Sequence, residues 1–272
     1  MSVFIIGGTG FIGHRLVRLL VARGHAVTCM DINLSAHSFA DLGAKVTSVR
    51  GDVTQFDDVM AAMAKAKPER VVNLSYFLGS DHAPHVAMKL NILGMDNCFE
   101  AARLLGVKHT MYASSLAVNG KQTHYGSRPV TEDDRVNGEY QYAKHKIVNE
   151  WQAQDYTEKF GMLITGIRPA NVTGPDKVRG SVDHVNVITE PSRGNAITFR
   201  SRTPCVARST WTTSRRFLRA CCSPRNPPTA STIPAALPSA WGRSPTSSVP
   251  TCPMPGSSLI RRPAARRPAA TT

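Results

Sequence analysis

The chain has 272 residues and a net charge of +14, a length that suits one large domain or a domain with a small lobe. An excess of positive charge spread over the whole chain would suggest a nucleic-acid binder. Residues 201–272, however, hold eleven of the 33 basic residues and no lysine, aspartate, glutamate or histidine. Residues 1–200 therefore carry 22 basic and 19 acidic residues, a near balance that argues against a nucleic-acid partner.

The sequence shows no sign of a membrane span, a secretion signal or a metal site. The longest early apolar run, residues 3–6, is far too short to cross a bilayer and does not follow a signal pattern. The six cysteines are irregularly spaced, which predicts neither a zinc site nor a disulfide framework. The histidines lack metal-ligand spacing as well, among them His82, His85, His124 and His184. We expect a cytoplasmic protein with no bound metal.

The first 24 residues contain an expected strand, a glycine-rich turn and an amphipathic helix, in that order. Residues 3–6 are wholly apolar, which is typical of a central parallel strand buried on both faces. Gly7, Gly10 and Gly13 follow with the spacing G-x-x-G-x-x-G. Glycines let the backbone approach a pyrophosphate closely, and the helix N-terminus offers unpaired N–H groups and a partial positive charge. This combination predicts a dinucleotide-binding site.

An acidic residue ends the next expected strand, residues 26–30. The carboxylate of Asp31 can accept hydrogen bonds from both adenosine ribose hydroxyls, and it would repel a 2′-phosphate. No arginine follows it directly. NAD is therefore favoured over NADP as the cofactor, although Asp31 would also serve as a simple cap of the strand end.

Expected strands and helices alternate through the first 170 residues. Further strands are expected at 45–51, 70–75, 108–115 and 163–169. Helices are expected from Thr54, as the cap, to about 66, within 86–105, and from about 140 to 160. Alternating strands and helices at this spacing predict an α/β fold with a Rossmann-type, doubly wound parallel sheet and right-handed crossovers.

Two kinds of catalytic candidate follow the expected strand at 108–115. Ser115 ends that strand at the carboxyl edge, where such sheets bind ligands, so its hydroxyl can reach a substrate oxygen. The next helix contains two overlapping pairs, Tyr140 with Lys144 and Tyr142 with Lys146. Because the unperturbed pKa of tyrosine is near 10, a tyrosine acid/base needs a nearby cation, which a lysine four residues on can provide.

These motifs together resemble the extended short-chain dehydrogenase/reductase family, the NAD-dependent epimerase/dehydratases. The matching pieces cover about 1–199 and are GGTGFIG at 7–13, Asp31, GDV at 51–53, VVNLS at 71–75, Asn91 in LNILG, YASSLAVNG at 112–120, the Tyr-x-x-x-Lys pair and RPANVTGP at 168–175. The family usually has a small residue after the tyrosine and an acid four residues after the lysine. Ala143 and Glu150 fit these marks for Tyr142 and Lys146, which favours that pair over Tyr140 and Lys144.

The resemblance also implies binding residues. Asp52 and Val53 would meet the adenine, and Tyr142 and Lys146 would contact the cofactor as well. The remaining NAD contacts would come from Gly7, Gly10, Phe11, Ile12, Gly13, Asp31, Leu74, Ser75, Asn91, Pro169 and Val172. Asn171 would join Ser115 in contacting a substrate. The chain departs from the family at 73–76, where a histidine followed by small residues is common and this chain has NLSY.

The resemblance implies an oxidoreductase that acts on a hydroxyl or keto carbon of a small-molecule substrate, with a nucleotide sugar as the expected substrate. A simple dehydrogenase or reductase for a small or steroid-like alcohol and a catalytically silent NAD-binding protein are the alternatives. Members of the family often pair their two long helices, so a homodimer through the helices near 86–105 and 140–160 is a further expectation.

The family pattern ends after residue 199, which leaves 1–199 as an NAD-binding domain with the catalytic residues. The tail, 200–272, holds twelve of the 18 prolines and shows no helical or strand period, so we expect irregular structure. We also consider a shifted reading frame, in which the third base of each codon is read with the first two bases of the next. In that frame the codons of residues 209–214 can encode His-Val-Asp-Asp-Val, and those of residues 231–236 can encode Tyr-Asn-Ser-Gly-Gly. Both resemble the family's substrate lobe, which supports the hypothesis that the tail is a frameshifted remnant of that lobe.

Overall fold

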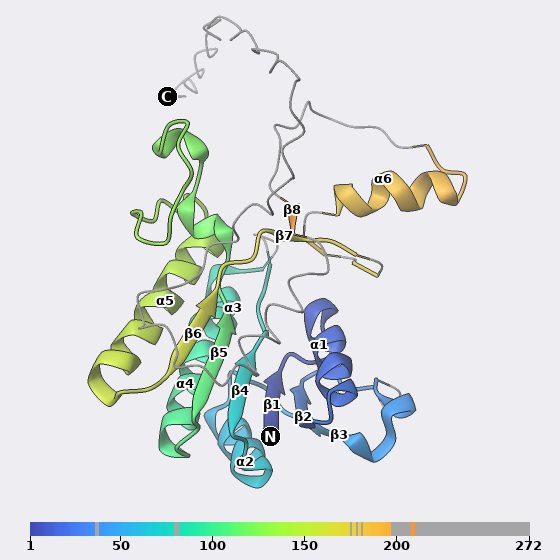
Figure 1. Cartoon of the computed structure of the whole chain (residues 1–272), viewed down its shortest axis with the longest axis vertical. Coiled ribbons are helices and arrows are strands. Elements are labelled where there is room, and N and C mark those ends of the chain that lie inside the picture. Colours follow the sequence, from blue (N-terminus) through green and yellow to red (C-terminus); the bar gives the residue numbers. More distant parts are fainter. Residues whose placement is uncertain are drawn as a thin grey trace, which may run out of the picture. The chain divides into compact units, whose positions relative to one another are not determined.

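Six parallel strands form a single sheet in the computed structural model (Figure 1). The structure describes residues 1–35, 38–78, 82–174, 176–177, 179–180, 182–196 and 208–209. The strands are β1 (Ser2–Ile6), β2 (Ala26–Asp31), β3 (Val46–Arg50), β4 (Arg70–Asn73), β5 (His109–Ala113) and β6 (Ile164–Ile167). Their order, β3-β2-β1-β4-β5-β6, confirms the predicted Rossmann-type, doubly wound sheet.

Helices connect the strands. The main ones are α1 (Phe11–Ala22), α2 (Phe56–Ala66), α4 (Gly94–Leu104) and α5 (Gln141–Phe160). The remaining elements are the 3₁₀ helices η1 (Ala40–Lys45), η3 (Leu116–Asn119) and η4 (Gln122–His124), helix α3 (Pro84–Met88), the π-helical turn η2 (Lys89–Leu93), helix α6 (Asp183–Ser192), and the short paired strands β7 (Asn171–Val172) and β8 (Arg208–Ser209). None of the described helices is long and apolar enough to span a membrane.

The core lies on both faces of the sheet, as the continuous apolar run of β1 predicts. Val3 and Ile5 pack with a cluster that includes Leu16 and Leu20 of α1. Phe4 and Ile6 point to the other face and pack with residues of α2 and α4. Because successive side chains of a strand alternate between faces, one short run provides the centre of two separate apolar layers.

Strand β6 ends at Ile167 rather than at residue 169, and three other predicted boundaries are wrong where a polar side chain bonds a nearby backbone group. Strand β4 ends at Asn73 rather than at residue 75, since the Asn73 carboxamide oxygen accepts hydrogen bonds from the backbone and hydroxyl of Ser75. Strand β5 ends at Ala113, and Ser115 instead caps η3. Thr54 does not cap α2, whose cap is Gln55, because the Thr54 N–H donates to the Asp52 carboxylate.

The sheet reverses its direction of growth between β1 and β4. Helix α1, which follows β1, covers one face, whereas α4, which lies between β4 and β5, covers the other. The loops after the two strands therefore diverge at the carboxyl edge, the usual place for a ligand in an open parallel sheet. These two loops border the candidate site, whose catalytic candidates follow β5.

Candidate functional site

The glycine-rich turn between β1 and α1 has a shape that only glycines permit. Gly7 has a φ of 77°, and a Cβ on it would lie 2.7 Å from the backbone nitrogen of Ser75. A Cβ on Gly13 would collide with the carbonyl oxygen of Gly7. Gly10 precedes α1 without a capping side chain, so the N–H groups of the first turn, which contains Phe11 and Ile12, are available. This bare backbone and helix N-terminus fit the pyrophosphate of a dinucleotide.

The glycine-rich turn also positions the predicted ribose-binding carboxylate. One oxygen of Asp31 accepts hydrogen bonds from the backbone N–H and the hydroxyl of Thr9, at 3.2 and 2.6 Å. The other oxygen accepts from the N–H of Asn33 at 3.1 Å. Asp31 is thus fixed beside the turn at the end of β2, where a carboxylate binds adenosine ribose hydroxyls in Rossmann-type folds.

Two residues predicted to meet the adenine lie in the loop after β3. Val53 is buried in the apolar cluster under that loop, and its carbonyl accepts a hydrogen bond from Asn97 of α4 at 2.9 Å. The carboxylate of Asp52 accepts a hydrogen bond from the backbone N–H of Thr54. The backbone N–H of Asp52 donates to the carboxylate of Asp58 at 2.9 Å. These contacts hold the loop against α2 and α4, and a direct adenine contact stays a prediction.

The side chain of Asn91 hydrogen-bonds the backbone of the loop after β4. The side-chain oxygen of Asn91 accepts from the N–H of Phe77 at 2.8 Å, and its NH₂ group lies 3.3 Å from both the Phe77 carbonyl oxygen and a ring nitrogen of His145. Asn91 is only 2% exposed, so it fixes this loop from the interior, and its predicted contact with the cofactor stays a prediction. Leu74 and Ser75 lie half-buried in the same loop, next to Gly7.

The structure brings three predicted catalytic residues together at the carboxyl edge of β5. Tyr142 lies in the first turn of α5, and its hydroxyl is close enough to the Ser115 side chain for that side chain to lower its pKa. The Nζ of Lys146 lies one turn further along, 5.7 Å from the centroid of the Tyr142 ring. It donates to the carbonyl oxygen of Ala113, the last residue of β5. The Ser115 hydroxyl also accepts from the N–H of Ala117, which fixes its orientation.

The alternative pair lies outside this cluster. Tyr140 precedes α5 as its cap residue and is 55% exposed. Its ring stacks on Tyr142 at 6.1 Å, and Lys144 is exposed. The geometry therefore favours Tyr142 and Lys146.

Burial dominates the electrostatics of the cluster. It raises the pKa of Tyr142, although the hydrogen bond from Ser115 opposes that effect. Burial also holds the pKa of Lys146 well below its usual value, and the negative charge of Glu150 opposes that decrease. Both shifts favour the neutral side chains. An added positive charge would favour the Tyr142 phenolate, and an oxygen acceptor from a ligand would favour the Lys146 ammonium.

A buried ion pair between Arg168 and Glu150 lies next to the cluster of Ser115, Tyr142 and Lys146. The guanidinium of Arg168 donates to both oxygens of Glu150, at 2.9 and 2.7 Å, and the Ser114 hydroxyl donates to the same carboxylate. These contacts join the end of β5 to α5 and the residue after β6. Glu150 is the acid that the family resemblance placed four residues after Lys146. The structure gives a physical reason for an acid here, because its carboxylate pairs with the buried guanidinium of Arg168. The contribution of Arg168 and Ser114 was not predicted.

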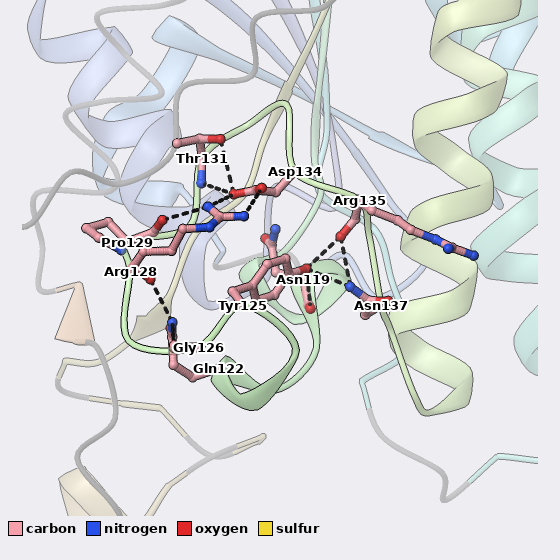
Figure 2. Close-up of polar contacts among 10 residues, drawn as sticks. All are labelled: Asn119, Gln122, Tyr125, Gly126, Arg128, Pro129, Thr131, Asp134, Arg135 and Asn137. Atoms are coloured by element: carbon pink, nitrogen blue, oxygen red, sulfur yellow. Dashed lines mark hydrogen bonds and ion pairs between the residues drawn. The ribbon is translucent and has the colours of Figure 1, made fainter.

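The connection between η3 and α5 is held by side-chain bonds to the backbone (Figure 2). The amide of Gln122 donates to the carbonyl oxygens of Gly126 and Arg128, both at 2.9 Å. The Tyr125 hydroxyl approaches two more carbonyl oxygens, and Arg128 pairs with Asp134. The ion pair depresses the pKa of Asp134. These contacts order the connection that leads into α5, the helix that carries Tyr142.

The segment after β6 carries the last predicted contacts. The carbonyl oxygen of Pro169 accepts from the N–H of Leu116 at 3.0 Å, which places it beside Ser115. Asn171 and Val172 form β7, which pairs in parallel with β8. Apart from 208–209, which form that strand, the predicted irregular tail lies outside the described residues. No group of three or more potential metal ligands occurs among the residues that are described.

Comparison with known proteins agrees with this arrangement. The model of the NAD-dependent epimerase/dehydratase family matches residues 3–201. A UDP-glucose 4-epimerase of Mycolicibacterium smegmatis is 32% identical over 64% of this chain and 57% of its own length. A 3-beta-hydroxysteroid dehydrogenase of Mycolicibacterium neoaurum is 27% identical over 63% and 48%.

A solved structure shows the same fold. The UDP-glucose 4-epimerase of Thermus thermophilus, in complex with NAD, has a TM-score of 0.65 and 25% identity over 72% of this chain and 64% of its own. The chain spans about half the length of the curated relatives that it matches. On the family match and the shared sheet, the chain belongs to the NAD-dependent epimerase/dehydratase family.

Proposed function

We propose that this protein is an NAD-dependent oxidoreductase of the epimerase/dehydratase type that acts on a hydroxyl-bearing carbon of a nucleotide sugar. The observation that carries the proposal is the convergence of Ser115, Tyr142 and Lys146 after β5, at the same carboxyl edge of the sheet as the glycine-rich turn. Relatives named UDP-glucose 4-epimerase support the substrate class.

In this proposal the Tyr142 phenolate removes the proton of the substrate hydroxyl while the Ser115 hydroxyl donates a hydrogen bond to the same oxygen. Bound NAD⁺ supplies the hydride acceptor. The Lys146 ammonium stabilises the phenolate; lowering the pKa of Tyr142 by about 3 units from its ordinary value requires about 4 kcal/mol. In an epimerase, Tyr142 would return the proton after the keto form of the substrate is reduced on its other face.

A second candidate is a simple dehydrogenase for a steroid-like alcohol, which the similarity to a 3-beta-hydroxysteroid dehydrogenase favours. Net formation of NADH from an alcohol substrate would indicate that activity. Inversion of a sugar carbon without net NADH would indicate the epimerase. If a chain with its tail repaired binds NAD but turns over no substrate of either class, that result would favour an NAD-binding protein without catalysis.

Because a frameshifted tail would leave the chain without its substrate lobe, the test compares two matched tyrosine variants of a chain in which the reading frame after residue 199 has been restored. Incubation with NAD⁺ and UDP-glucose or UDP-galactose, followed by product analysis, should show turnover by the parent and by Tyr140→Phe. Tyr142→Phe should abolish turnover and leave NAD affinity largely unchanged, because the glycine-rich turn and Asp31 are intact. A silent Tyr140→Phe beside an active Tyr142→Phe would contradict the assignment.

We also propose a homodimer through the helices near 86–105 and 140–160. Helix α5 exposes Trp151 at 70% and Val148 at 40%, whereas η2 exposes Leu93 at 45% and α4 exposes Leu104 at 51%. Exposed apolar side chains of this size favour association. Light scattering after size exclusion should give the mass of a dimer, and Trp151→Glu should give that of a monomer.

A further inference from the structure

The ammonium of Lys146 is one of the most deeply buried charged groups among the described residues. Lys146 is only 2% exposed. Its Nζ has three hydrogens to donate, yet the described residues offer it one oxygen acceptor, the Ala113 carbonyl at 2.5 Å. Burying a charge without compensating contacts is costly and drives a lysine toward its neutral form. A contact that favours the ammonium over the neutral amine would oppose this shift.

The face of the Tyr76 ring provides such a contact. The Nζ of Lys146 lies 3.2 Å from the centroid of this ring, well within the range of a cation–π contact. The same ring meets that of Tyr142 edge-on, with the centroids 5.4 Å apart. Tyr76 thus touches both members of the predicted acid/base pair. It occupies the position where the sequence departs from the small residues common in the family.

The other groups around Lys146 do not replace this contact. Tyr142 offers its ring only at 5.7 Å. Glu150 favours the ammonium through its charge, but its carboxylate oxygens accept from Arg168 and Ser114. The positive charge of Arg168 also offsets that of Glu150. The ring of Tyr76 is therefore the closest favourable partner of the ammonium after the Ala113 carbonyl.

We propose that Tyr76 is a positioning residue that holds the charged Lys146 ammonium beside Tyr142 through the face of its aromatic ring. The proposal deepens the proposed function, on which it rests for the role of Lys146. It assigns a use to the unusual aromatic residue after β4: this ring preserves the cation that the Tyr142 phenolate needs.

The Tyr76 hydroxyl provides a matched control. It is buried and has no hydrogen-bond partner among the described residues. Phenylalanine retains the ring and removes only this unpartnered group, so Tyr76→Phe should keep the contact. Leucine retains much of the apolar volume but has no π face, so Tyr76→Leu should lose it.

The experiment measures the pKa of Lys146 directly in the full chain without ligand. Lysine labelled with ¹³C at the ε carbon is titrated by NMR, and the Lys146 signal is assigned by its loss in Lys146→Met. A desolvated cation–π contact of about 2 kcal/mol corresponds to about 1.5 pKa units. We expect Tyr76→Leu to lower the pKa of Lys146 by about 1 to 1.5 units and Tyr76→Phe to leave it within about 0.3 units of the parent. A loss of packing alone would lower stability without moving this titration selectively.

Two results would overturn the proposal: an unchanged pKa of Lys146 in Tyr76→Leu, or an equal decrease in Tyr76→Phe. NAD affinity of the same three proteins, measured by calorimetry, separates this outcome from a failure of the proposed function. If the parent binds no NAD, the proposed function fails whatever the lysine titration shows. If the parent binds NAD and the titrations of all three proteins coincide, only the role of Tyr76 fails.

Discussion

Replacing Glu150 with glutamine tests the link between the buried ion pair and the reaction centre. Glutamine is close in size to glutamate but leaves the Arg168 guanidinium without its counter-charge. The side chains of Arg168 and Glu150 are only 6% and 10% exposed, so water cannot replace the lost partner. Breaking a buried pair from one side costs about 3–5 kcal/mol, and because glutamine can still accept one hydrogen bond we expect about 3 kcal/mol.

The assay is urea unfolding of the full chain, followed by circular dichroism, with thermal unfolding as a second measure. For a chain of this size, about 3 kcal/mol corresponds to a decrease in Tm of about 10 °C. Glu158→Gln, on the same helix but exposed, is the matched control and should change stability by less than about 0.5 kcal/mol. The loss of negative charge should also lower the pKa of Lys146 further, since Glu150 opposes its decrease.

The outcome that would refute this reasoning is a Glu150→Gln protein as stable as the Glu158→Gln control. It would mean that solvent or a neighbouring group compensates Arg168. The double variant Glu150→Leu with Arg168→Met removes both charges and should recover much of the stability, because replacing a buried pair by apolar groups is often neutral. A double variant less stable than Glu150→Gln would show that the pair itself stabilises the fold.

Three further predictions concern the cofactor, pH and the tail. Calorimetry should show tighter binding of NAD than of NADP. Asp31→Ala should reduce this difference in affinity, because the variant lacks the carboxylate that repels a 2′-phosphate and keeps Arg50, the neighbour of residue 31 in the sheet register. Equal affinities of the parent for NAD and NADP would contradict this prediction. Burial lowers the pKa of His109 from 6.5 to about 4, so stability present above pH 6.5 should decrease by about 3 kcal/mol as the pH falls to 4, and His109→Gln should flatten that part of the urea-unfolding profile. Limited proteolysis should remove 201–272 quickly and leave a fragment that ends near 195–200, and DNA sequencing around codon 199 should reveal the shifted frame; a protease-resistant tail would contradict both expectations.

The fold was predictable because its signals are local. The apolar run of β1, the glycine spacing and the regular alternation of strands and helices each depend on a few neighbouring residues, and a doubly wound parallel sheet follows from that alternation. The strand ends were not predictable to the residue. Asn73, Asp52 and Ser115 use their side chains to bond nearby backbone groups, and such local competition with strand or helix formation depends on details that periodicity does not contain.

The candidate site was predictable only where a motif fixes the spacing. Tyr142 and Lys146 lie one helical turn apart, so the sequence alone places them on one face, and Ala143 with Glu150 selected this pair over its neighbour. Tyr76 gave only a negative signal, a bulky residue where small ones are usual. Its meaning depends on a contact between a loop after β4 and a helix more than sixty residues later, a pairing that neither composition nor period encodes. The residue that departs from the family therefore needs a structure to be interpreted, whereas the residues that match it do not.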